Sequence, residues 1–134
     1  MIKLSRFDKK FYESLPEKEE IYFVKEGKYY TLFFNTRKIG VVGFTPVKNT
    51  KEDGFVQIVL LKEFRGKGLV EEAEMKLVKR CKLRKLYATI QKNNLASIKA
   101  HKKIGFKILP KEKIEELREK SFLKPDQVRL EKVF

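Results

Sequence analysis

Two glycines and two basic residues stand together at positions 65–68, between an apolar run at 55–61 and a helical pattern. Gly66 and Gly68 lack Cβ atoms, so the chain there can adopt positive φ and let a ligand approach the peptide N–H groups. N–H groups in the first turn of a helix have no partner within the helix and lie at the positive end of its dipole. Arg65 and Lys67 add positive charge at the same place. This turn therefore predicts a phosphate-binding site.

The glycine spacing excludes two common phosphate-binding loops. A dinucleotide-binding fingerprint would need a third glycine where Glu71 stands, and a P-loop would need Gly-Lys-Ser/Thr where the chain reads Gly68-Leu69-Val70. A lone Gly-x-Gly is also compatible with a tight strand-to-helix turn that binds nothing. The phosphate site therefore needs support from another part of the chain.

A second motif, NLASIKAHKKIGF at 94–106, gives that support. Together with EFRGKGL at 63–69, it resembles the GCN5-related N-acetyltransferases (GNATs), whose acetyl-CoA motif is Q/R-x-x-G-x-G/A and whose next helix reads N-x-x-S/A before Y-x-x-x-G-F. The resemblance covers positions 38–109. It implies the GNAT fold and an acetyl-CoA-dependent N-acetyltransferase.

The chain departs from the family pattern in and after the first motif. Glu63 stands where the pattern has Gln or Arg, and Val70 stands where Gly or Ala is frequent. Glu71, Glu72 and Glu74 place three carboxylates in the first two helical turns. These acids stabilise the helix through its dipole, but they would compete with a bound pyrophosphate.

The resemblance also implies how acetyl-CoA is held. The CoA pyrophosphate would lie on the N–H groups of 66–69 beside Arg65 and Lys67, and the pantetheine arm would pair with the backbone of 59–61 like an added strand. Asn94 would contact the pantetheine or pyrophosphate region, although Asn is also a preferred helix N-cap. The implied cofactor-binding residues are Val59, Leu60, Leu61, Arg65, Gly66, Lys67, Gly68, Leu69, Asn94 and Ser97.

His101 stands where family members commonly have the tyrosine that protonates the leaving CoA thiolate. Asn94, Ser97 and His101 recur at i, i+3 and i+7, so they share one face of a helix. A role as general acid competes with a solvent-facing or capping role, since a positively charged protein opposes the imidazolium form. No residue stands out as a general base, and a base acting through water is equally compatible with the sequence.

The hydrophobic periodicity predicts the elements that position these motifs. Alternating aromatic and β-branched residues at 28–35 and 39–47 predict a hairpin, and 55–61 predicts a third antiparallel strand. Helices are expected at 8–15, 66–81, 94–104 and 111–120, and strands at 2–4, 86–91, 106–109 and 127–134. The stretch 21–24 can be strand or loop. These elements predict an α/β (α+β) fold with a mixed antiparallel and parallel central sheet and helices on both faces.

Composition limits the class of protein and of ligand. The 134 residues predict one domain at 1–134, and the net charge of +14, from 32 basic and 18 acidic residues, attracts anionic ligands. One cysteine, Cys81, and one histidine leave too few ligands for a structural zinc site, so no metal is expected. No apolar run reaches the roughly 18 residues of a membrane span, and no signal peptide is evident. We therefore expect a soluble, cytoplasmic protein that does not bind membranes.

The sequence does not identify the acceptor amine. A cation such as a polyamine must approach against the field of the protein, so an acidic peptide or an anionic small amine is favoured. The alternative is a non-catalytic module of the same fold that binds nucleic acid or CoA through its basic face. That face would consist of Lys79, Arg80, Lys82, Arg84 and Lys85, with Tyr29 and Tyr30 available to stack on bases.

Overall fold

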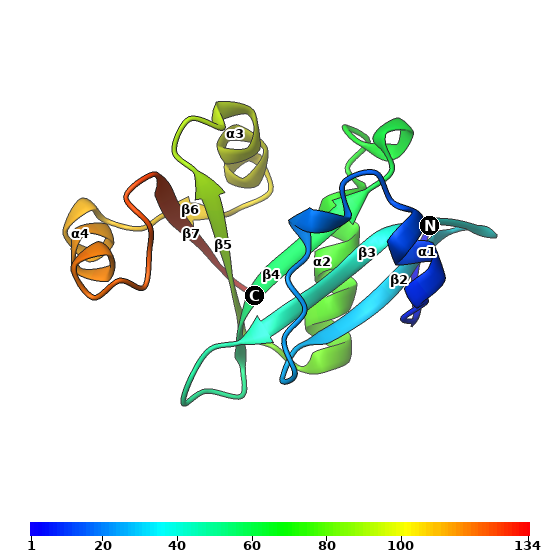
Figure 1. The fold of residues 1–134 in the computed structure, drawn as a ribbon, viewed down its shortest axis with the longest axis horizontal. Coiled ribbons are helices and arrows are strands. Elements are labelled where there is room, and N and C mark those ends of the chain that lie inside the picture. Colours follow the sequence, from blue (N-terminus) through cyan, green and yellow to red (C-terminus); the bar gives the residue numbers. More distant parts are fainter.

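A seven-stranded sheet runs through the computed structural model, which describes residues 1–134 (Figure 1). Its strands are β1 (Ile2–Arg6), β2 (Lys28–Phe34), β3 (Arg37–Pro46), β4 (Asp53–Leu60), β5 (Lys85–Gln91), β6 (Lys107–Ile108) and β7 (Gln127–Val133). The α-helices are α1 (Lys9–Ser14), α2 (Leu69–Cys81), α3 (Leu95–Lys103) and α4 (Lys111–Glu119), and short 3-10 turns occur at η1 (Lys18–Glu20) and η2 (Lys62–Phe64).

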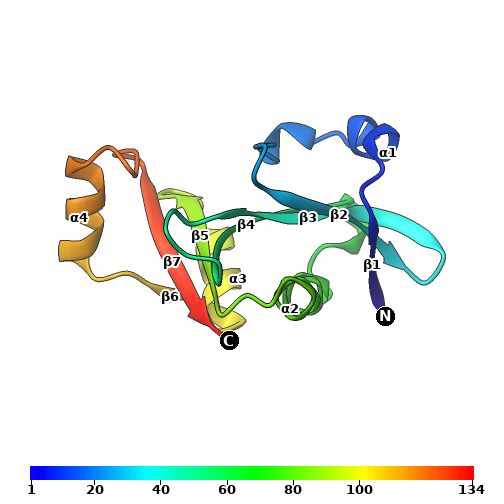
Figure 2. The same cartoon turned by 90° about the horizontal axis from the view of Figure 1, so that it is seen from below.

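The sheet is mixed, as the sequence predicts. Its strand order is β1-β2-β3-β4-β5-β7-β6, and β4 and β5 form its one parallel pair. Helices α2 and α3 lie on one face, and α1 and α4 lie on the other (Figure 2). The crossover from β4 through α2 to β5 therefore forms the expected βαβ unit.

The packing of α2 explains how the turn predicted to bind phosphate is fixed. Leu69, Ala73, Leu77 and Val78 are buried against the sheet in the main hydrophobic core. Their spacing is that of an amphipathic helix with one apolar face. Burial of Leu69, the first helical residue, anchors the helix N-terminus directly beyond the two glycines. A second, smaller core of Leu15, Ile21, Val41 and Val59 lies on the opposite face of the sheet.

The structure corrects several boundaries and one orientation. The helix predicted from position 66 begins at Leu69, because 62–64 forms a 3-10 turn and Gly68 has the left-handed conformation. The strand expected at 106–109 shortens to Lys107–Ile108, and 21–24 is not a strand. Glu74 is 1% exposed, although a charged residue of an amphipathic helix is expected on its exposed face. Because three of the first six helical residues are glutamates, the sequence pattern does not show which of them faces the core. No helix of the chain combines the length and the apolar character needed to cross a membrane.

Candidate active site

A gap opens between β4 and β5 in the middle of the sheet. The two strands pair only where Asp53–Phe55 faces Lys85–Tyr87, and they diverge beyond this point (Figure 1). Residues 55–58 are only partly buried, although β4 is a central strand. Because a central strand normally has both edges paired, the far half of β4 leaves backbone hydrogen-bonding groups open on the side of β5.

The register of β3 and β4 shows which backbone groups face the gap. The Leu61 N–H donates to the Ile39 carbonyl at 2.8 Å, and the Val47 N–H donates to the Asp53 carbonyl at 3.1 Å. Alternate residues of a strand point their amides to opposite sides, so odd-numbered residues of β4 face β3. The backbone groups of Ile58 and Leu60 therefore face the gap. Of the predicted residues Val59, Leu60 and Leu61, only Leu60 does so.

The turn after β4 presents the open amides that the glycine spacing predicts. Gly66 and Gly68 have φ of 73° and 76°, in the left-handed region. A Cβ atom at either glycine would meet no heavy atom within 4 Å, so this surface of the turn is open. No backbone or side-chain oxygen of the chain accepts a hydrogen bond from the N–H groups of residues 66–69. The turn 66–69 thus offers a set of free donors at the N-terminus of α2, which suits an anion.

The two basic residues of the turn differ in their surroundings. Arg65 donates from Nε to the Leu60 carbonyl at 3.1 Å and forms an ion pair with Glu17 of the segment before η1. Its guanidinium therefore links the end of β4 to the α1 face of the sheet. Lys67 is exposed, with Nζ 5.7 Å from the centre of the Phe64 ring. Lys67 is the more available of the two for a phosphate.

The acids at the start of α2 are engaged elsewhere. Glu72 accepts a hydrogen bond from the Ile2 N–H at 2.7 Å and lies 3.5 Å from Lys76 Nζ. The Ile2 N–H and Lys76 hold the pKa of Glu72 below its usual value. Glu71 lies 3.8 Å from Lys132 Nζ. Each of these two carboxylates has a positive partner, Lys76 of the same helix or Lys132 of β7, which reduces its repulsion of an anion at the turn.

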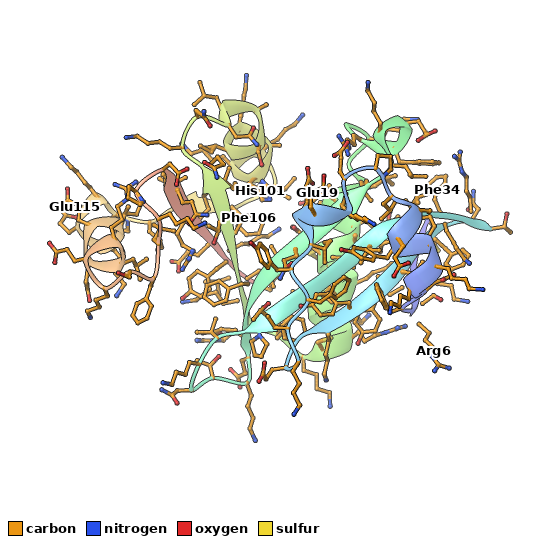
Figure 3. The ribbon with its side chains drawn as sticks, in the orientation of Figure 1. Arg6, Glu19, Phe34, His101, Phe106 and Glu115 are labelled. Carbon is orange, nitrogen blue, oxygen red and sulfur yellow. The ribbon has the colours of Figure 1, made fainter.

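The second motif forms the helix on the other side of the gap. Asn94 is the N-cap of α3, since its Oδ1 accepts a hydrogen bond from the Ser97 N–H at 3.1 Å. His101 Nδ1 lies 2.8 Å from the Ser97 carbonyl, and its ring packs edge-on against Phe106 at 5.2 Å between centroids (Figure 3). A carbonyl can only accept, so Nδ1 carries the proton of that bond and Nε2 is left free. The Ser97 hydroxyl is 3.5 Å from the same ring nitrogen.

A cavity of about 540 Å³ lies at the closed end of the gap. Phe55 and Tyr87, the last paired residues of β4 and β5, form part of its wall. Its other apolar walls are Val47, Leu109, Leu117 and Phe122, and its charged lining residues are Lys48, Lys113, Arg129 and Glu131. Local sequence patterns do not show that these residues come together, because α4 and β7 contribute to the cavity from far along the chain.

The residues proposed for base stacking are used inside the protein. Tyr29 packs on Phe23 at 4.6 Å between ring centroids, and its hydroxyl donates to the Tyr22 carbonyl at 2.7 Å. The Tyr30 hydroxyl lies 3.5 Å from Cys81 Sγ, and Arg80 lies over the Tyr30 ring at 5.2 Å. Neither ring is free to stack on a base, and this removes the aromatic part of the nucleic-acid hypothesis.

Comparison with known proteins decides the family. The profile described as "Acetyltransferase (GNAT) domain" matches residues 6–107. The chain belongs to the GNAT acetyltransferase family. It is therefore an acetyl-CoA-dependent acetyltransferase, as the two motifs predict. A comparison with curated protein sequences finds no match.

Solved GNAT structures share the fold over the whole chain. One is the Campylobacter jejuni N-acetyltransferase PseH in complex with acetyl coenzyme A, with a TM-score of 0.71, 16% identity and 99% coverage of both chains. A Bacillus subtilis acetyltransferase in complex with CoA has a TM-score of 0.70 and 13% identity, with 99% of this chain and 97% of that chain covered. A chimera of the spermidine N-acetyltransferase SpeG from Vibrio cholerae and hSSAT has a TM-score of 0.72 and 16% identity, with 98% of this chain and 95% of that chain covered. At these identities the likeness shows the fold.

Proposed function

We propose that this GNAT transfers an acetyl group from acetyl-CoA to the primary amine of an anionic small molecule or an acidic peptide. The observation that carries the proposal is the continuity of two features, the open amides of 66–69 and the unpaired edge of β4. A pyrophosphate on the turn would place the pantetheine arm along that edge. The arm contains amides, and the backbone groups of Ile58 and the N–H of Leu60 can pair with them as a neighbouring strand would, whereas the Leu60 carbonyl already accepts a hydrogen bond from Arg65 Nε.

The transfer step then needs little from side chains. The neutral amine attacks the thioester carbonyl carbon, the carbonyl oxygen gains negative charge, and the C–S bond breaks as the carbonyl re-forms. A backbone N–H at the open edge of β4 can stabilise the developing oxyanion, a contribution of roughly 3 kcal/mol in acyl transfer. The amine proton leaves through water, because Glu52 and Glu63 are exposed. Asp53 is buried, but it stands at the paired end of β4 and β5, and its carboxylate lies 3.9 Å from Arg84.

His101 is the proposed donor for the leaving thiolate. Its Nδ1–H is bonded to the Ser97 carbonyl, so only Nε2 is free to deliver a proton. The imidazolium form would give the Nε2 proton to the CoA sulfur and become the neutral Nδ1–H tautomer that the same carbonyl stabilises. The Ser97 carbonyl thus orients the ring for the reaction.

The positive charge of the protein indicates which kind of acceptor it favours. The net charge of +14 opposes the approach of a polyamine and favours an amine that carries negative charge. One structure of similar fold is a spermidine N-acetyltransferase chimera, but at 16% identity its substrate does not transfer to this chain.

Two substitutions separate binding from chemistry. Gly68→Glu places bulk, charge and an unfavourable positive φ at the turn, so CoA affinity measured by isothermal titration calorimetry should fall by at least about 100-fold. His101→Phe keeps the ring packing on Phe106, so CoA affinity should stay within about twofold of wild type while turnover of acetyl-CoA falls about 100-fold. Turnover is measured as thiol release with a panel of amines.

Each variant has a control. Gly68→Asn adds a side chain of similar size that tolerates positive φ and carries no charge, so it should lose much less CoA affinity than Gly68→Glu. Lys103→Gln changes an exposed side chain of the same helix that has no contact with His101, so turnover should be near that of wild type. Unchanged CoA affinity in Gly68→Glu would show that the turn is not the pyrophosphate site. Unchanged turnover in His101→Phe would remove His101 from the reaction.

A further inference from the structure

Arg129 is a buried cation with no carboxylate partner. Its residue is 9% exposed, and no Asp or Glu oxygen lies within 4.0 Å of its guanidinium. The basic residues of β5 and β7 beside it do have partners, since Lys85 pairs with Glu131 at 3.6 Å and Lys132 pairs with Glu71 at 3.8 Å. Burying a charge without a counter-charge is costly, so an unpaired buried guanidinium requires an explanation.

Neutral contacts hold the Arg129 side chain in one position. Nε donates to the Thr89 hydroxyl at 3.0 Å, and Nη2 donates to the Phe122 carbonyl at 3.3 Å. The guanidinium lies over the Phe55 ring at 4.8 Å from its centre. These contacts fix the orientation of the guanidinium but leave its positive charge without a counter-charge. Burial accordingly lowers the pKa of Arg129 from its usual value.

The remaining nitrogen of Arg129 is open to the cavity. Nη1 donates to no acceptor within the chain. Unlike Arg118 Nε, which is enclosed without a partner, Nη1 is accessible. Arg129 lines the cavity at the closed end of the gap. The free N–H groups of Arg129 Nη1 can therefore donate to a ligand in the cavity.

The cavity combines apolar walls with an excess of positive charge. Lys48, Lys113 and Arg129 contribute three positive charges, of which Lys113 lies 3.8 Å from Glu116. Glu131 is the one acid of the lining, and it is paired with Lys85. Apolar walls with few fixed polar groups are typical of small-molecule sites. Such a lining favours a ligand with an apolar body and one anionic group, and it disfavours a polyamine.

We propose that this cavity binds the acceptor, and that Arg129 recognises a carboxylate on an amine with an apolar body, as in an apolar amino acid or the C-terminal part of a peptide. The inference rests on the proposed function, which places the thioester in the gap between β4 and β5. Phe55 and Tyr87 join the cavity to this gap, so an acceptor in the cavity would lie next to the thioester. A carboxylate on Nη1 would supply the missing counter-charge, while the apolar walls would hold the side chain of the acceptor.

The test uses reaction products that contain no CoA, in matched pairs with and without the carboxylate. The pairs are N-acetyl-L-phenylalanine with N-acetyl-2-phenylethylamine, and N-acetyl-L-leucine with N-acetyl-3-methylbutylamine. Dissociation constants are measured by NMR titration of the whole protein. At least one carboxylated member should bind wild type about tenfold more tightly than its match, and Arg129→Gln should abolish this preference.

Two controls keep the result interpretable if Arg129→Gln folds poorly. Arg118→Gln removes the same charge from α4, where Arg118 donates to the Gln127 carbonyl at 2.9 Å and does not line the cavity, so the preference should remain. In wild type, the carboxylated probe should shift the Nε–H resonance of Arg129, and its match should not.

The inference is overturned if neither pair shows a carboxylate preference in wild type, or if the preference survives in Arg129→Gln. The proposed function is tested separately, because the probes do not need the CoA site. It is contradicted if the protein does not bind CoA or does not transfer acetyl groups. A carboxylate preference in a protein that does not bind CoA would keep the cavity assignment and reject the acetyl-CoA site.

Discussion

The carboxylate of Glu74 is enclosed in the core with neither oxygen hydrogen-bonded. Burial raises its pKa to about 8 from an ordinary value of 4.5, opposed in part by Lys132. Between these two pH values the folded protein holds a proton that the unfolded chain has lost, so the free energy of unfolding falls as pH rises. The expected slope is about 1.4 kcal/mol per pH unit, and it vanishes above the folded-state pKa.

Glu74→Gln removes this titration and keeps the shape of the side chain. The variant should gain stability relative to wild type from pH 5 to pH 8, as measured by urea denaturation at several pH values. Glu115→Gln, on the exposed face of α4, is the control and should leave the pH profile of wild type unchanged. A constant difference between Glu74→Gln and wild type across this range would contradict the assigned ionisation.

At the scale of elements, β4 has one edge that is paired and one that is open. Hydrogen exchange can read this asymmetry residue by residue. The amides of Gln57 and Val59 face β3 and should be protected with or without ligand, whereas those of Ile58 and Leu60 should exchange rapidly in the free protein. Saturating CoA should slow exchange at Ile58 and Leu60 by at least about tenfold if the pantetheine arm occupies the edge. Equal exchange at all four amides would show that the edge is not open.

Local patterns in the sequence were sufficient to predict most of these elements. Period-two and helical repeats identify β2, β3 and α2, and the glycines identify the open turn, because each depends on neighbours within one element. The separation of β4 from β5 could not be predicted, since both strands have ordinary apolar patterns. It depends on how far their pairing extends, which is a long-range property.

Arg129 escaped prediction for a related reason. β7 alternates Gln127, Arg129 and Glu131 with apolar residues, which is the usual pattern of a strand with one exposed face. That face is instead covered by α4 and by the segment after it, whose Phe122 carbonyl accepts from Arg129. The burial of Arg129 follows from tertiary packing that no local pattern records. His101 was placed correctly on its helix, but the bond of Nδ1 to the Ser97 carbonyl needed coordinates.

For the whole molecule, the net charge of +14 predicts how acetyl-CoA arrives. An anion is drawn to the protein by long-range attraction, which salt weakens because the Debye length shortens from about 10 Å at 0.1 M to about 3 Å at 1 M. The association rate constant of acetyl-CoA, measured by stopped flow, should therefore fall about tenfold between 0.05 and 0.5 M NaCl. The dissociation rate constant should change less, because hydrogen bonds to the turn 66–69 act at contact distance.

S-acetylpantetheine is the matched control for this prediction, since it carries the thioester and the pantetheine arm but no phosphate. Its association rate constant should be nearly independent of salt, because an uncharged ligand gains nothing from the field of the protein. A common salt dependence for the two ligands would mean that salt acts on the protein itself. In that case the excess of basic residues would have no part in capturing the cosubstrate. The surface charge would then need an explanation other than attraction of phosphates to the turn 66–69.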